Sequence, residues 1–343
     1  MTYFRPSIDA MQGYIPGEQP QQTGFIKLNT NENPYPPSPR VIEAIHKTAT
    51  DRLRLYPDPV ARNFCESAGK LLGVSADSVL ATNGSDEALT ILMRACVGEG
   101  RKVVAPLPSY GLYGVLADIQ GCCLKSIPWQ PDGSLPSDFT AGASLALITN
   151  PNSPTGTMLP PATLLKMAEQ ASCLVVADEA YADFAPVNSV PDISQCERLV
   201  VTRTLSKSYS LAGLRFGFIV ADPKVIATLM KVKDSYNVDA ISIAAATAAI
   251  EDRTYFDTCR QKVLATRDRL ETALAKLGFT VTPSQANFVW IERNDPLRPI
   301  YESLKEQKIL IRYFHLAANK EGLRISVGTD AEIDACLDAM ARM

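Results

Sequence analysis

Three short runs composed only of apolar residues and threonine constrain the fold most. They are LALIT at 145–149, LVVA at 174–177 and LVVT at 199–202. Segments with helical periodicity separate such runs, for example at 160–170. Strands that are apolar on both faces and alternate with helices are typical of a mostly parallel sheet covered by helices on both sides. The chain is therefore predicted to have an α/β fold.

Polar segments follow each of these runs directly. NPNSPTG follows the first run, DEAY the second and RTLSK the third, which places Asp178 and Lys207 just beyond two buried strands. In open parallel sheets ligands bind beyond the carboxyl ends of the strands. A buried carboxylate is costly unless it meets a cation, and a lysine in such a place can be held neutral or bound as an imine. The pattern predicts a reactive site at this edge.

Composition excludes several functional classes. The chain has Lys+Arg 34 against Asp+Glu 37 and a net charge of −3, so no basic excess indicates a nucleic-acid partner. Its longest apolar stretch, at 240–250, is too short to cross a bilayer. The first twenty residues lack the apolar core of a secretory signal. We expect a globular protein that binds neither membranes nor nucleic acid.

The cysteines and histidines narrow the chemistry further. Eight cysteines lie in apolar surroundings without a C-x-x-C motif, which predicts buried, reduced thiols in the cytoplasm and no metal site. His46 and His315 are the only histidines, and neither lies in a recognisable nucleophile motif. We therefore expect the chemistry to use lysine, carboxylates, tyrosines or a cofactor.

The chain divides into three parts by pattern. Residues 1–40 contain NTNENPYPPSP and similar Pro-, Gly- and Asn-rich stretches, which predict an extended arm that belongs with the small domain. Residues 41–240 carry the alternating strands and helices of a large α/β domain. Residues 241–343 begin with long helices and continue with short strands, as in a smaller α+β domain.

One set of residues suits pyridoxal phosphate. This cofactor needs an amine for its aldehyde, an anion at its ring nitrogen, donors for its phosphate and a flat face against its ring. Lys207 and Asp178 supply the first two, and Arg215 lies close enough in the chain to frame the same pocket. The segment NGSDEAL at 83–89 opens a predicted helix whose free amides suit a phosphate.

These motifs give the chain a clear resemblance. It resembles the fold-type I pyridoxal-phosphate-dependent aminotransferases, and more narrowly the histidinol-phosphate aminotransferases. The matching stretches run in the family order from residue 28 to residue 329: LNTNENPYPPSP, YPDP, NGSDEAL, PSYGLY, NPNSPTG, DEAYADF, RTLSKSYSLAGLRFG, ANFVWIE and LRISVGT. The resemblance implies a large domain with a mostly parallel seven-stranded sheet, a smaller α+β domain and an N-terminal arm.

The resemblance also implies roles around the cofactor ring. Lys207 would form the Schiff base and then act as general base and acid, and Asp178 would pair with the pyridine nitrogen. Tyr181 would donate to the phenolic oxygen, and Tyr110 would stack on the ring. The residues assigned to the cofactor phosphate are Gly84, Ser85, Asp86, Ser206 and Arg215, joined by Tyr56 of the partner subunit. A homodimer with a shared active site is thus implied.

One position departs from the family pattern. Relatives usually read Asn-Asn-Pro-Thr-Gly, and the asparagine before the proline contacts the phenolic oxygen. Here Ser153 holds that position and Asn152 precedes it. Either Ser153 makes a shorter-reaching bond or Asn152 replaces the missing contact. We assign the cofactor contact to Asn152 as an expectation.

The implied reaction is transamination of L-histidinol phosphate with 2-oxoglutarate in histidine biosynthesis. Arg312 and Arg324 would bind the anionic end of either substrate, and Tyr14 of the arm matches a substrate-contacting tyrosine. Two alternatives keep the same cofactor, namely an aromatic amino-acid aminotransferase and a threonine-phosphate decarboxylase of corrinoid synthesis. A non-catalytic regulatory domain that binds the cofactor is a third, but the arm has no room for a DNA-binding module and no basic face.

Overall fold

The computed structural model describes residues 3–317 and 320–343. Its largest element is a seven-stranded sheet with the strand order β2-β8-β7-β6-β5-β3-β4. The strands are β2 (Val79–Thr82), β3 (Lys102–Leu107), β4 (Cys123–Pro128), β5 (Leu145–Thr149), β6 (Leu174–Asp178), β7 (Leu199–Thr204) and β8 (Gly217–Val220). Strand β8 runs antiparallel to both of its neighbours, and the other paired strands are parallel. The predicted mostly parallel sheet is confirmed.

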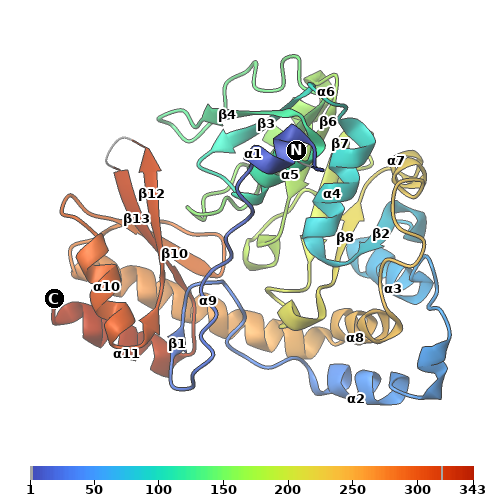
Figure 1. Ribbon diagram of the computed structural model, residues 1–343. Coiled ribbons are helices and arrows are strands. Elements are labelled where there is room, and N and C mark those ends of the chain that lie inside the picture. The colour runs from blue at the N-terminus through green and yellow to red at the C-terminus, as the bar shows by residue number, and fades with distance from the viewer. Residues whose placement is uncertain (1–2, 318–319) are drawn as a thin grey trace.

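Helices cover both faces of this sheet, as Figure 1 shows. The alternation of side chains along a strand explains it, since Ala146 and Ile148 of β5 belong to one core and Leu145 and Leu147 to the other. The first core is shared with α2 (Pro39–Thr48), α3 (Arg62–Leu72), α6 (Pro161–Gln170) and α8 (Ala240–Glu251). The second is shared with α4 (Gly84–Cys96), α5 (Leu112–Gln120) and α7 (Pro223–Leu229). Burial on both faces explains why most residues of these strands are apolar, as the sequence predicted.

A second, antiparallel sheet forms the smaller part of the molecule. Its strand order is β12-β13-β10-β9. The strands are β9 (Thr280–Thr282), β10 (Phe288–Glu292), β12 (Arg312–Ala317) and β13 (Lys320–Ser326), and the helices that accompany them are α9 (Arg253–Lys276), α10 (Arg298–Glu306) and α11 (Asp330–Ala341). Leu270 of α9, Val289 of β10 and Ile333 of α11 belong to its core.

Helix α8 modifies the expected domain boundary. Ala245, Ala246 and Ala249 of this helix are buried in the core beneath the large sheet. The sequence analysis assigned residues 241–343 to the small domain, but this packing joins α8 to the large one. We therefore propose a division between α8 and α9, the long helix that runs on toward the small sheet in Figure 1.

The N-terminal arm connects both parts of the molecule (Figure 1). Its short helix α1 (Pro6–Ala10) lies beside α5, where Arg5 donates a 2.5 Å hydrogen bond to the Ile119 carbonyl. Farther along, β1 (Ile26–Lys27) pairs in parallel with β11 (Ile309–Leu310) of the smaller part. Short 3₁₀ helices complete the fold: η1 (Asp51–Arg54), η2 (Ala76–Ser78), η3 (Ala182–Phe184), η4 (Val190–Asp192) and η5 (Ala212–Leu214).

Candidate active site

A cavity of about 410 Å³ lies among the large sheet, the arm and the small sheet. That volume is typical of a small-molecule site. Most of the predicted site residues line it: Tyr14, Ser85, Asp86, Tyr110, Asp178, Tyr181, Ser206, Lys207, Arg215, Arg312 and Arg324. The other three predicted residues, Tyr56, Gly84 and Asn152, lie outside its lining. The fold thus gathers residues from the arm, the ends of β6 and β7, the start of α4 and the small sheet.

Asp178 is the last residue of β6 and is only 2% exposed. Its two carboxylate oxygens accept hydrogen bonds from the Tyr113 hydroxyl at 2.8 Å and the Thr202 hydroxyl at 3.0 Å. Burial raises the pKa of Asp178 to about 6, against the lowering effect of both donors. Since both of these donors are neutral, the carboxylate retains its attraction for a cation that enters the cavity.

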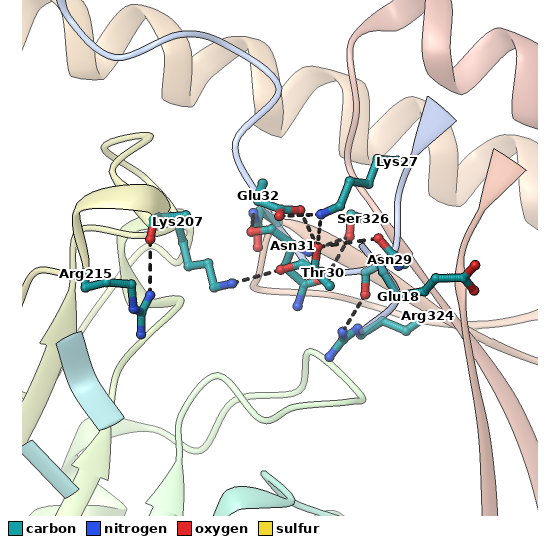
Figure 2. A network of polar contacts seen from close by, with 12 residues as sticks. Glu18, Lys27, Asn29, Thr30, Asn31, Glu32, Lys207, Arg215, Arg324 and Ser326 are labelled. Atoms are coloured by element: carbon teal, nitrogen blue, oxygen red, sulfur yellow. Dashed lines mark hydrogen bonds and ion pairs between the residues drawn. The ribbon is translucent and has the colours of Figure 1, made fainter. Parts of the chain in front are cut away.

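Lys207 follows β7 and lines the same cavity. Its ammonium group donates a 2.9 Å hydrogen bond to the Thr30 carbonyl of the arm, as Figure 2 shows. Burial, together with the positive charges of Arg324 and Arg215, lowers the pKa of Lys207 to about 8. A substantial fraction of this amine is therefore neutral and nucleophilic near pH 8.

The start of α4 and Arg215 bring together hydrogen-bond donors that suit an anion. The N-cap residue Asn83 makes no side-chain hydrogen bond to the first turn, and Ser85 and Asp86 line the cavity there. Arg215 donates to the Ser206 hydroxyl at 3.4 Å and to the Asp86 carboxylate at 3.2 Å. Helix N-termini with free amides bind phosphate, and a guanidinium beside one strengthens the site.

Gly84 allows this close packing. Its φ is +80°, in the left-handed region, and a Cβ atom there would lie 3.0 Å from Nη2 of Arg215. Gly217 approaches the same turn from β8, where a Cβ atom would lie 2.6 Å from the backbone of Gly84 and Ser85. Gly84 therefore shapes the anion site without lining it.

Tyr110 and Tyr181 place two phenol rings at the cavity. The Tyr110 hydroxyl donates to Asp86 at 3.2 Å, and its ring meets Tyr113 edge-on with centroids 5.7 Å apart. Tyr181 is 8% exposed and accepts a 3.0 Å hydrogen bond from the Asn31 side chain. Burial raises the pKa of Tyr181, and the positive charge of Arg324 opposes this rise. Tyr181 is therefore a protonated donor at neutral pH.

Ser153, and not Asn152, faces the cavity from the loop after β5. Asn152 is fully buried, and its amide donates to the Thr155 hydroxyl of its own loop at 2.8 Å. Ser153 accepts a 3.1 Å hydrogen bond from Arg324. Asn152 therefore lies behind Ser153 relative to the cavity, and its assignment as a cofactor contact stays a prediction.

Arg312 and Arg324 lie directly opposite each other on β12 and β13. Like charges in this position repel. Arg324 donates to the Asn29 carbonyl and to Ser153, both at 3.1 Å, while its Nε is buried without a partner among the described residues. Burial and the charge of Arg312 lower the pKa of Arg324. An anion placed between the two guanidinium groups would relieve this repulsion.

Tyr14 and Tyr56 have different surroundings. Tyr14 lies at the cavity, with its ring edge-on to Tyr110 at 6.1 Å. Tyr56 is 80% exposed and stacks on Tyr236, with ring centroids 4.4 Å apart. Within one chain, Tyr56 is therefore a surface residue.

The chain was next compared with known proteins. The family model for aminotransferase class I and II matches residues 23–340. The chain belongs to this family. It is 50% identical over 339 residues to histidinol-phosphate aminotransferase of Rhodopirellula baltica, covering 97% of this chain and 94% of the relative. It is 46% identical to histidinol-phosphate aminotransferase 1 of Trichormus variabilis, covering 96% of each.

Solved structures agree with this assignment. The crystal structure of histidinol-phosphate aminotransferase from Sinorhizobium meliloti in complex with pyridoxal-5'-phosphate has a TM-score of 0.90 and 27% identity. The match covers 100% of this chain and 97% of that one. The predicted fold-type I aminotransferase architecture is confirmed.

Several residues of this aminotransferase site escaped the sequence analysis. Tyr113 and Thr202 bind Asp178, and Thr30 binds Lys207. Asn31 binds Tyr181 from the arm. In the sequence, Tyr113 lies two residues after a glycine at a predicted helix start, and nothing there indicates a chemical role. Only the folded structure shows that it lies opposite the end of β6 and binds Asp178.

Proposed function

We propose that this aminotransferase transfers the amino group of L-histidinol phosphate to 2-oxoglutarate, giving imidazole-acetol phosphate and L-glutamate. The observation that carries the proposal is a single cavity with two chemically distinct parts. One part holds Lys207 and Asp178 at the sheet edge, and the other holds the arginine pair of the small sheet. The 50% identity to a histidinol-phosphate aminotransferase over nearly the whole chain supports the substrate.

The residues of the cavity fit pyridoxal 5'-phosphate. The open cradle at Gly84, which a Cβ atom would crowd, and the donors of Ser206 and Arg215 suit its phosphate. The buried carboxylate of Asp178 suits a protonated ring nitrogen. When bound, the cofactor supplies a ring that accepts the electron pair released at the substrate Cα and carries the amino group between the substrates.

Lys207 is the residue proposed to move the proton at the substrate Cα. Its lowered pKa of about 8 makes it an effective general base near neutral pH and a general acid afterwards. Asp178 holds a fixed negative charge in a buried position, where electrostatic stabilisation is strong. Tyr110 and Tyr181 line the cavity, and Tyr181 is the one of the two whose hydroxyl proton is not already donated to Asp86.

The arginine pair is proposed to hold the anionic end of the substrate. A guanidinium binds phosphate and carboxylate equally well through its two parallel N–H donors. The phosphate of histidinol phosphate and a carboxylate of glutamate can therefore use Arg312 and Arg324 in turn. Tyr14 of the arm also lines the cavity.

The working form is proposed to be a homodimer in the cytoplasm. Leu53, Leu55, Tyr56 and Tyr236 are between 47% and 80% exposed, and this apolar group suits contact with a second copy. Tyr56 of the partner subunit would then reach the cofactor phosphate. The structure has no helix long and apolar enough to span a membrane within the described residues. The free, largely buried cysteines support a reducing compartment.

A substrate comparison tests the proposal. The purified protein, loaded with pyridoxal phosphate, is assayed with histidinol phosphate, phenylalanine, tyrosine and threonine phosphate against 2-oxoglutarate. We expect the largest kcat/KM for histidinol phosphate. A larger value for an aromatic amino acid, or release of carbon dioxide from threonine phosphate, would identify one of the alternative activities.

Borohydride reduction tests the cofactor linkage. We expect reduction to fix the cofactor onto Lys207, and Lys207→Ala to abolish this labelling. Lys224→Ala, which changes an exposed lysine on α7, serves as the matched control and should be labelled like the wild type. A protein that stays colourless after incubation with the cofactor would contradict the proposal.

A further inference from the structure

Asn31 of the arm is held by two groups of the smaller part of the molecule. Its backbone N–H donates to the Ser326 hydroxyl at 2.8 Å, and its carbonyl accepts from the Asn287 side chain at 3.0 Å. The residue is 1% exposed and has a φ of 57°, in the left-handed region that asparagine tolerates better than most residues. The end of β13 and the segment before β10 therefore determine where its side chain lies.

The hydrogen bonds also determine which way its amide group points. The Ser326 hydroxyl accepts from the Asn31 backbone and donates its single proton to Oδ1 of Asn31 at 2.8 Å. Figure 2 shows these contacts. The opposite amide orientation would leave the proton of Ser326, a residue 2% exposed, without an acceptor, which is costly. Nδ2 of Asn31 is therefore the atom that meets Tyr181.

This orientation sets the direction of the next hydrogen bond. Because Nδ2 of Asn31 donates to the Tyr181 hydroxyl at 3.0 Å, the hydroxyl oxygen is an acceptor there and its own proton must point elsewhere. Tyr181 lines the cavity, so that proton is available to a ligand. The Ser153 hydroxyl also hydrogen-bonds Tyr181 and lowers its pKa, as a donor to the phenol oxygen does, so this bond does not take up the Tyr181 proton. The charged groups near Tyr181 are Arg324 of β13, Asp178 of β6 and the ammonium of Lys207, which lies 6.0 Å from the ring centroid.

We infer that Asn31 is a positioning residue that directs the Tyr181 proton into the cavity, toward the phenolic oxygen of the bound cofactor. The inference rests on the proposed function, because it assigns the acceptor of that proton. It adds a chain of donors, Ser326 to Asn31 to Tyr181, that starts in the small sheet and ends at the cofactor. The adjacent Thr30 carbonyl holds Lys207, so the same arm segment contacts both reactive side chains.

The test is the pH midpoint of the visible absorbance change in the cofactor-loaded enzyme, which reports protonation of the nitrogen between Lys207 and the cofactor. A donor to the phenolic oxygen withdraws negative charge that would otherwise stabilise the protonated nitrogen. Asn31→Gly suits the left-handed backbone and removes the amide. We expect it to raise the midpoint by about 0.5–1 pH unit.

Two more variants make the result decisive. Ser326→Ala removes the hydroxyl that fixes the orientation of the Asn31 amide, so the amide can rotate by 180°. We expect this variant to raise the pH midpoint as well. Asn33→Ala is the matched control. The Asn33 side chain also attaches the arm to the large domain, by a 3.1 Å hydrogen bond to the Ser208 carbonyl, but this bond does not involve Tyr181. We expect the wild-type midpoint for Asn33→Ala.

The outcomes separate the two proposals. A folded, coloured Asn31→Gly enzyme with the wild-type midpoint would overturn the role of Asn31 and leave the proposed function standing. A midpoint shift of equal size in Asn33→Ala would likewise overturn it, because arm docking alone would then explain the change. A wild-type protein without a visible band would instead refute the proposed function.

Discussion

Asp178 and Lys207 have pKa values that burial moves in opposite directions. Burial raises the pKa of the carboxyl group to about 6 and lowers that of the amine to about 8. In both cases the low-polarity surroundings disfavour the charged form. A bound cofactor with a protonated ring nitrogen would favour the charged form of Asp178, and a covalent bond to the amine would remove the need to bury an ammonium. Binding of the cofactor would therefore reduce the free-energy cost of burying both groups.

Asp178→Asn should separate catalysis from folding. Asparagine has nearly the same size as aspartate and can still form hydrogen bonds, but it carries no charge. We therefore expect turnover to fall by about 100-fold or more. Stability should change in a pH-dependent way in the cofactor-free protein. Because the folded pKa is raised from 3.8 to about 6, the folded state binds the proton more tightly, and wild-type stability falls as pH rises from about 4 to about 6.

Urea unfolding at several pH values measures this second effect. Between pH about 4 and about 6, the free energy of unfolding of the wild type should fall by about 2–3 kcal/mol relative to that of Asp178→Asn. Equal pH dependence in the two proteins would show that Asp178 has an ordinary pKa in the folded state. Near-normal turnover of the variant would remove its role at the ring nitrogen.

The lowered pKa of the Lys207 amine leads to a prediction for the pH dependence of cofactor uptake. Only the neutral amine attacks the aldehyde, so the rate at which the cofactor-free protein takes up pyridoxal phosphate should rise with pH and level off above a midpoint near 8. Stopped-flow absorbance measures this rate. A midpoint near 10.5, the usual value for lysine, would contradict the environment described for Lys207.

Arg324→Ala should weaken both half-reactions. Removing a buried guanidinium from an anion site costs about 1.5–3 kcal/mol, so kcat/KM should fall by about 10-fold to 150-fold with histidinol phosphate and with glutamate. Arg293→Ala, which changes an exposed arginine paired with Asp295, should leave both values unchanged. An effect limited to glutamate would show that the two substrates use different anion sites.

At the level of elements, the start of α4 carries a clear physical role. The helix begins at Gly84 with a positive φ, so its first amides and Arg215 reach the same point. The partial positive charge of a helix N-terminus attracts phosphate, and this attraction declines within the first turn. Small changes in this turn should therefore alter cofactor binding more than stability.

Gly84→Ala tests that expectation. A Cβ atom would stand 3.0 Å from Arg215, and we expect about a 10-fold weaker cofactor affinity, measured by fluorescence titration, since 1.4 kcal/mol corresponds to a factor of ten. Gly133→Ala is the matched control, because Gly133 also has a φ near +80° but nothing lies within 4 Å of its Cβ position. Both variants share the backbone strain, so only crowding at the anion site separates them.

On the scale of the whole molecule, the arm joins the two sheets. It pairs with β11 at Ile26–Lys27 and then places Asn29, Thr30 and Asn31 against the cavity. Arg324 of β13 and Lys207, which follows β7, both donate to backbone carbonyls of this segment. The arm segment is therefore in contact with both the small sheet and the reactive lysine.

A mixing experiment tests the proposed homodimer. Tyr56→Ala and Lys207→Ala should each be inactive, because one lacks the phosphate contact given to the partner and the other lacks the reactive amine. Mixed dimers contain one site with both residues intact, so we expect activity to return on mixing under exchange conditions. Mixed samples that stay inactive, or a monomer in sedimentation, would contradict a shared site.

The sequence by itself determined the large sheet and the identity of the chemistry. LALIT, LVVA and LVVT consist of apolar residues and threonine and lie where helices cover both faces of the sheet, and local pattern is enough to predict such strands. The same local segments end in Asp178 and Lys207, so the reactive edge could be predicted from adjacent residues. The ordered motifs then identified the aminotransferase family, which the comparisons confirm.

Only the tertiary structure decided how these groups are held. Asn31 meets Tyr181 across 150 positions of sequence and Ser326 across 295, and no local periodicity encodes such pairs. The same holds for the contact of Tyr113 with Asp178. It also holds for the loop after β5, whose closure decides that Ser153 and not Asn152 lines the cavity. Hydrogen-bond direction and burial are properties of the packed chain, because each depends on neighbours that folding brings from distant segments.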